Sequence, residues 1–136
     1  MLYKDSERRL VNADLFGKEA ENLAVSLKQS RLSNRQLRKV YAELRALEGR
    51  IRSHEDLEEG LGLVKPYITL FLTRLRYRER QNLEAFRRIR DYLEELLRDV
   101  KSYEDFRVVV QAFEAVVAHF IGLEAEKNAS RKRGRK

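Results

Sequence analysis

The sequence contains no cysteine and no tryptophan, and it has only one proline and two histidines among its 136 residues. Without cysteine, neither a disulfide nor a thiolate zinc site can form. The two histidines, His54 and His119, lie far apart in the sequence, so they do not suggest a shared metal site. The acidic segment from Glu55 to Glu59 lacks the spaced oxygen ligands and the glycine of a calcium loop. The sequence therefore predicts neither a metal site nor a cofactor site.

Motifs that support catalysis are also missing. The chain has no glycine-rich phosphate loop, no nucleophile elbow and no cysteine–histidine pair. The longest apolar stretch, Tyr67 to Leu72, is too short to span a bilayer, and the N-terminus leads into charged residues rather than a secretory signal. We therefore expect a cytoplasmic protein that is not an enzyme and has no membrane partner.

The residues that are abundant favour an all-α fold. Leucine, alanine, glutamate and arginine dominate, and apolar residues recur at alternating spacings of three and four, as on one face of a helix. No long segment alternates between apolar and polar residues. Five helices are predicted: from Asn12 or Asp14 to about Ser30, from Ser33 to about Arg52, from 63–65 to about Tyr77, from Asn82 to about Val100, and from Ser102 to Glu126.

Local signals set these boundaries. Ser33 and Gln36 form a capping-box pattern, and Asn82 is a typical N-cap residue. Pro66 fits best in the first turn of a helix, so His54 to Gly62 is expected to be an acidic connection. The first dozen residues show no periodicity and are expected to be loose. The prediction is a single-domain bundle of about five helices over residues 1–126, followed by a disordered basic C-terminal tail over 127–136.

The net charge of +7 is distributed unevenly along the chain. Residues 127–136 contain six basic residues and no acidic one, so residues 1–126 carry a net charge of only +1. Within those 126 residues, segments 28–52 and 65–90 each contain eight basic and two acidic residues. Segments 53–62 and 91–106 each carry a net charge of −4. This segregation predicts basic and acidic faces on one small protein.

The first basic segment places arginines seven residues apart. Spacing of seven keeps side chains on nearly the same side of a helix, and this side is turned away from the apolar one. The simplest alternative is a solubilising face whose arginines pair with Glu43 and Glu48. As a nucleic-acid surface, this segment contributes the candidates Arg31, Arg38, Arg45 and Arg52, flanked by Arg35 and Lys39.

The second basic segment ends in an arginine-rich turn around Tyr77. Guanidinium groups at a helix end can reach phosphates from several directions, and Tyr77 either stacks on a base or completes the core. The alternative is that these arginines only complement the helix dipole. The candidates in this turn are Arg74, Arg76, Arg78 and Arg80.

Three stretches, in order, resemble the small helical subunit of the type III-A CRISPR effector, the Csm complex. They are Leu32-Ser33-Asn34-Arg35-Gln36-Leu37-Arg38-Lys39-Val40-Tyr41-Ala42-Glu43-Leu44, Val64-Lys65-Pro66-Tyr67 and Phe113-Glu114-Ala115-Val116-Val117-Ala118. The last is the most specific, because the family carries a Phe-Glu-Ala-aliphatic-Val-Ala sequence there. An aromatic residue usually follows, where this chain has His119, and the family's central Gly-Arg pair is missing after Lys65.

The resemblance implies a non-catalytic, RNA-binding role in antiviral defence. Small subunits of that family line the channel that holds guide RNA and target RNA, beside the backbone and large subunits and other copies of themselves. The resemblance assigns this RNA-binding role to Arg38 in the early helix and to Lys65 in the central segment. Arg74, Arg76 and Arg78 are candidates in place of the missing Gly-Arg pair. The alternative is a helical scaffold that self-associates through its charged faces without binding nucleic acid, with the seams at 37–51 and 86–100 pairing with partner helices.

Overall fold

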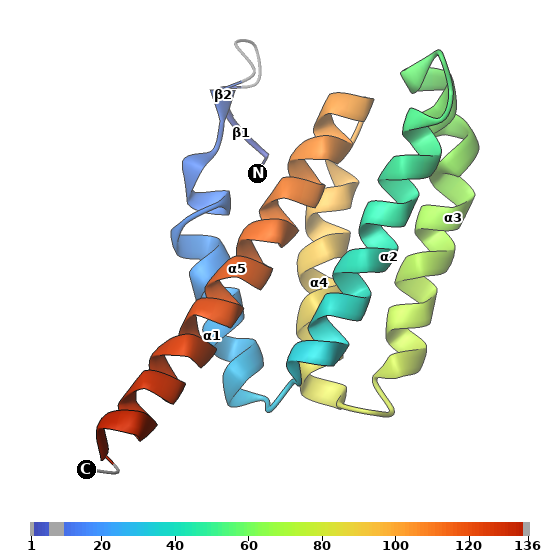
Figure 1. The fold of residues 1–136 in the computed structure, drawn as a ribbon. Helices are drawn as coiled ribbons and strands as arrows, with labels where there is room; N and C mark the ends of the chain where they lie inside the picture. The colour runs from blue at the N-terminus through green and yellow to red at the C-terminus, as the bar shows by residue number, and fades with distance from the viewer. Residues whose placement is uncertain (1, 6–9, 135–136) are drawn as a thin grey trace.

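The fold is a bundle of five helices, as the sequence predicts. The computed structural model describes residues 2–5 and 10–134. Helix α5 packs against α1 and α2, α3 packs against α2 and α4, and α4 also contacts α1 and α5 (Figure 1). The helices are α1 (Lys18–Gln29), α2 (Asn34–Arg52), α3 (Leu57–Arg78), α4 (Leu83–Arg98) and α5 (Tyr103–Gly134).

The apolar seams of α2 and α4 close one common core. Leu37 and Leu44 on α2 and Ile89 and Leu93 on α4 are fully buried within this single chain. Because burial of these side chains supplies the main driving force for folding, the seams are not available to partner helices. The part of the scaffold hypothesis that paired these seams with a partner is therefore wrong.

Helix α5 is the central helix. Over Tyr103–Arg131 it is long and apolar enough to cross a membrane by length and composition alone. In the fold, half of its most apolar window is buried, and Phe106, Phe113 and Phe120 are fully enclosed by the other helices. The apolar character of α5 is thus explained by its place in the core.

The same helix continues further than expected. The sequence predicts an end at Glu126, whereas the helix continues through Gly134, because segment 124–129 is rich in glutamate, alanine and lysine, which favour helix. All side chains from Ala125 to Arg131 are exposed. The division into a domain and a disordered tail at residue 126 stays a prediction, and residues 135–136 lie outside the described residues.

Helix α3 begins earlier than expected. The sequence predicts a connection from His54 to Gly62, but α3 starts at Leu57 and contains Pro66 in its interior. Asp56 caps the helix by accepting hydrogen bonds from the amides of Glu58 and Glu59, at 3.0 and 3.1 Å. Pro66 is tolerated because it lies on the exposed side, where water can reach the carbonyl that lacks a helical partner.

The N-terminal residues are ordered by contacts with α5. Strands β1 (Tyr3–Asp5) and β2 (Leu10–Val11) pair antiparallel, and a short 3₁₀ helix, η1 (Ala13–Leu15), precedes α1. Leu2 is buried, and the Tyr3 hydroxyl donates a 2.6 Å hydrogen bond to Asp105 Oδ1. For residues 2–5 and 10–12 the expectation of a loose segment is therefore wrong, because an apolar anchor and a hydrogen bond over a long sequence separation hold them, while residues 1 and 6–9 lie outside the described residues.

The helix connections divide the molecule into an acidic end and a basic end. Figure 1 places the α2–α3 and α4–α5 connections at one end and the other two connections at the opposite end. At the first end the Tyr103 amide donates to Glu58 Oε1 at 3.1 Å. At the second end the Asn82 side chain donates to the Ser30 carbonyl at 2.8 Å. The acidic segments 53–62 and 91–106 therefore reach one end, and Arg31 and Arg80 lie near the other.

Candidate nucleic-acid interface

Three arginines on α2 face outward together. Arg38, Arg45 and Arg52 are exposed and follow one another at spacings of seven. Ser33 caps α2 with a complete capping box, so the helix that aligns them begins at Asn34. Among the side chains of residues 2–5 and 10–131, none pairs with any of the three arginines within 4.0 Å; Glu43, one of the two expected partners, binds Arg78 instead. We call Arg38, Arg45 and Arg52 the α2 stripe.

The α2 stripe borders a polar groove between α2 and α5. Arg45 and Arg52 line it from α2, and Arg107 lines it from α5. The groove has a volume of about 230 Å³ and also contains Glu48 and Glu114. Sequence reasoning missed Arg107. Its signal is the exposed series on α5 with spacings of three and four, opposite the apolar face: Glu104, Arg107, Gln111 and Glu114.

Tyr41 also lines this groove. Its ring centre is 6.3 Å from that of Phe113 and 5.8 Å from the guanidinium carbon of Arg45. Partial burial and the nearby Glu114 raise the pKa of the Tyr41 hydroxyl, while Arg45 lowers it. The pKa of Tyr41 therefore depends on the charge of Arg45, the central arginine of the α2 stripe.

Arg31 is not on α2. It lies in the turn after α1, with a φ of 62°, the only positive φ at a non-glycine residue among the residues described. The helical spacing that joined it to the α2 stripe fails there because α2 begins at Asn34. An arginine in this left-handed conformation costs about 1 kcal/mol relative to glycine. Arg35 and Lys39 are exposed on the first turns of α2, close to this end of the molecule.

The arginines from Arg74 to Arg80 do not form one cluster. At 100° per residue, Arg74 and Arg76 lie about 200° apart around α3. The guanidinium of Arg78 donates to Glu43 on α2, and both side chains are mostly shielded from solvent. Neighbouring Glu79 is 3.3 Å from Arg90 of α4. This turn therefore holds α2, α3 and α4 together.

Tyr77 is the exposed member of this turn. Its side chain is 63% exposed, and the guanidinium carbon of Arg80 lies 4.1 Å from the centre of its ring. Of the two interpretations that the sequence left open, completion of the core is excluded. Stacking on a base stays a prediction.

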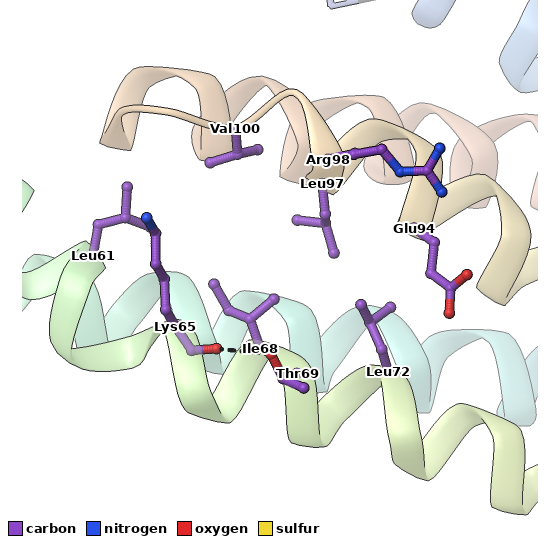
Figure 2. A pocket seen from close by; sticks show the side chains of 9 residues that line it. All are labelled: Leu61, Lys65, Ile68, Thr69, Leu72, Glu94, Leu97, Arg98 and Val100. Carbon is purple, nitrogen blue, oxygen red and sulfur yellow. Dashed lines mark hydrogen bonds between the residues drawn. The ribbon is translucent and has the colours of Figure 1, made fainter.

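Lys65 lies on α3 and lines a different groove from Arg45 and Arg52. It lines a groove between α3 and α4 with a volume of about 410 Å³ (Figure 2). This groove and the one between α2 and α5 share no lining residue. Arg38, the other candidate that the family resemblance supplied, is exposed on α2 and lines neither groove.

Both histidines are close to backbone carbonyls. His119 Nε2 is 3.2 Å from the Phe16 carbonyl, and His54 Nδ1 is 3.0 Å from the Arg50 carbonyl. Across the described part of the chain, no group of three potential metal-binding side chains comes together. Each histidine thus has a backbone carbonyl within hydrogen-bonding distance of its ring.

Comparison with known proteins gives one match. The sequence model of the Csm2 Type III-A family matches residues 11–121. No curated protein and no solved structure matches the chain. The matched range contains η1, α1 to α4 and α5 as far as Ile121, and with them both grooves and every candidate arginine.

Proposed function

This chain belongs to the Csm2 family and is a small subunit of a type III-A CRISPR complex, and we propose that it binds the RNA of that complex without catalysing a reaction. The three stretches that carried the family resemblance, 32–44, 64–67 and 113–118, all fall within the matched range. The RNA would be guide RNA and target RNA, held beside the backbone and large subunits of a cytoplasmic complex that acts in antiviral defence.

The observation that carries the proposal is the α2 stripe. Three exposed arginines lie on one side of one helix, unpaired within the described residues, and Arg107 adds a fourth cation from α5. If this face served solubility alone, ion pairs between these arginines and the nearby Glu48 and Glu114 would be expected, because they would lower the electrostatic energy. Guanidinium groups that remain unpaired can donate two parallel hydrogen bonds to a phosphate.

Such contacts favour the RNA backbone over base edges. Arginine–phosphate pairs position a strand but carry no direct sequence information. Glu48 and Glu114 in the same groove repel phosphates, so the strand is expected to follow the arginines rather than enter the groove deeply. A small subunit of this kind would hold any guide and target sequence.

The test is filter binding of single-stranded RNA over a salt series, with the subunit alone and in the assembled complex. With about five phosphate contacts, four from the α2 stripe and Arg107 and the rest from the basic C-terminal residues, the plot of log affinity against log salt should have a slope of about −3.5. Absence of binding at low salt in both preparations would contradict the proposal.

The C-terminal basic residues need a separate control. Residues 127–136 contain six of the chain's 29 basic residues and attract any polyanion. Deleting them should weaken binding and reduce the salt slope, but part of the binding should remain, because the α2 stripe is intact. Complete loss of binding in the deletion variant would assign the RNA contact to the tail and not to α2.

Self-association through charged ends is the second candidate function. The acidic and basic ends described above are complementary, and Leu63 and Leu70 on α3 are 56% and 42% exposed, seven residues apart on one side. Copies could therefore stack with unlike ends in contact. Sedimentation of the protein at low and high salt separates the candidates: salt-sensitive assembly without RNA affinity favours the scaffold, and a monomer that binds RNA excludes it.

A further inference from the structure

The groove between α3 and α4 has an apolar floor with charged side chains at its two ends. Figure 2 shows Ile68 and Leu72 of α3 pointing toward Leu97 of α4, with Leu61 and Val100 closing one end. Ile68 and Leu61 are buried, whereas Leu72, Leu97 and Val100 are partly exposed in the groove. Apolar surface of this kind, left open on a folded protein, suits an apolar part of a ligand.

Two cations flank this floor. In Figure 2 the amine of Lys65 lies near Leu61, and the guanidinium of Arg98 lies near Glu94 at the opposite end. Neither cation has a carboxylate within 4.0 Å among the residues that the structure describes. Glu94 also lines this end of the groove and lies 3.9 Å from Arg90. The groove therefore offers an apolar centre between two unpaired positive charges.

We propose that this groove binds one unstacked nucleobase of an RNA strand, with the flanking phosphates on Lys65 and Arg98. The inference rests on the proposed RNA-binding function and adds a second, separate contact to it. A nucleotide within a strand has a flat, largely apolar base and a phosphate on each side, which matches an apolar floor with a cation at each end. Bases taken out of the stack are commonly held between apolar side chains.

The arrangement of charges favours a nucleotide over a peptide terminus. A peptide C-terminus combines an apolar side chain with one carboxylate and would use only one of the two cations. The volume of about 410 Å³ lies near the lower end of the range for small-molecule sites, so it fits a base with its sugar rather than a helix. Charge and size thus point to the same ligand.

The test compares two probes on the full chain: a single-stranded oligoadenylate and a strand of equal length whose bases are removed at every second position. Both strands have the same phosphates, so contacts through the α2 stripe are retained. The intact probe should shift the methyl resonances of Ile68, Leu72 and Leu97. It should bind roughly five- to tenfold more tightly than the abasic probe, the gain expected from burying about 40–55 Å² of apolar base surface.

Variants then locate the difference. In Lys65→Ala/Arg98→Ala, both substitutions are at exposed positions, and the affinity ratio between the two probes should fall toward one. Arg87→Ala, which removes an exposed arginine of α4 outside the groove, should leave the ratio unchanged. If the affinity ratio between the two probes stayed high in the double variant, the base would be bound at another site, such as Tyr77, and the inference would be overturned.

The outcomes separate this inference from the proposed function. Tight binding of both probes without methyl shifts would overturn the base site while leaving phosphate binding by α2 intact. Failure of both probes to bind, alone and in the complex, would overturn both proposals. Methyl shifts caused by the other complex subunits in the absence of RNA would make the groove a protein-docking site and would also overturn the inference.

Discussion

The arginines of α2 and those from Arg74 to Arg80 look equally suited to phosphate binding in the sequence, yet they have different surroundings in the fold. Arg38, Arg45 and Arg52 share one exposed side of a helix and have no ion-pair partner within the described residues. Arg78, in contrast, is bound to Glu43 and mostly shielded from solvent. Local charge density alone therefore does not distinguish a binding surface from a structural one.

The spacing of the arginines explains this difference. A spacing of seven corresponds to nearly two full helical turns, so successive side chains stay on one side. A spacing of two turns successive side chains by about 200°, so they reach opposite sides of the helix. In a bundle, one of those sides meets a neighbouring helix, and an arginine there requires an acidic partner. We expect the α2 stripe to bind RNA and Arg78 to stabilise the fold.

The largest expected effect is on RNA binding by the α2 stripe. At about 0.1 M salt, each phosphate contact with a single strand contributes roughly fivefold in affinity, so loss of two contacts costs roughly 25-fold. Arg38→Glu/Arg45→Glu should therefore weaken binding by at least roughly 25-fold in a filter assay. The matched control is Arg74→Glu/Arg76→Glu, which changes the net charge equally but should weaken binding only a few fold. Equal losses in the two variants would mean that net charge, and not the α2 surface, drives binding.

The next effect is on stability and concerns Arg78. The side chains of Arg78 and Glu43 are 16% and 30% exposed, so Arg78→Ala leaves a partly buried carboxylate without its partner. The free energy of unfolding should fall by about 1–2 kcal/mol, between the values for exposed and buried pairs. Urea denaturation measures this change, and RNA affinity should change little.

A double-mutant cycle with Glu43→Gln isolates the contribution of the pair. If the ion pair is responsible, Arg78→Ala should cost much less in the Glu43→Gln background than in the wild type. An unchanged cost would assign the effect to packing of the arginine stem. A large loss of RNA affinity in Arg78→Ala without loss of stability would reverse our division of the two basic regions.

How much of this could be predicted from the sequence depends on how local the signal is. The caps at Ser33 and Asn82 and the seams of α2 and α4 were predictable, because each depends on residues within a few turns. The start of α3 was missed although its N-cap, Asp56, is an equally local signal, because Gly60, Gly62 and Pro66 favour a later start. What the sequence does not show is the close approach of Gly60 to Ile51, where an added Cβ would lie 2.6 Å from the carbonyl oxygen.

The candidate site shows the same limit. The outward direction of Arg38, Arg45 and Arg52 followed from the helical period alone. The ion pair of Arg78 with Glu43, the contribution of Arg107 and the position of Lys65 in a groove of its own all depend on which helices become neighbours. The pattern of residues along the chain contains no direct record of those neighbours.

Arg31 provides a smaller and sharper test, because one substitution should affect fold and binding in opposite directions. Arg31→Gly removes a side chain from a left-handed position and should raise the free energy of unfolding by about 1 kcal/mol. It also removes a cation near the basic end and should weaken RNA binding by roughly fivefold if that cation contacts a phosphate. Arg31→Ala should weaken binding equally without the gain in stability. Unchanged RNA affinity in both variants would restrict the contact to α2.

The smallest expected effect is a change in the titration of Tyr41. Burial and Glu114 raise the pKa of Tyr41 above its ordinary value of 10.0, and Arg45 opposes them. The folded state therefore favours the neutral tyrosine. This contribution to stability is fully present below pH 10 and is lost at higher pH, once the unfolded chain ionises first. Arg45→Ala should raise the pKa of Tyr41 further, so the loss of stability above pH 10 should be steeper.

An ultraviolet absorbance titration measures this shift. Because the chain contains six tyrosines, the signal of Tyr41 is obtained by subtracting the titration of Tyr41→Phe in each background. Arg74→Ala is the matched control, since Arg74 is not among the groups that affect Tyr41. If removal of Arg45 left the titration of Tyr41 unchanged, the Arg45 guanidinium would be located mainly in solvent and not in the groove beside Tyr41. The α2 stripe would then be a set of independent solvated cations, and the distinction from the arginines at 74–80 would rest on exposure alone.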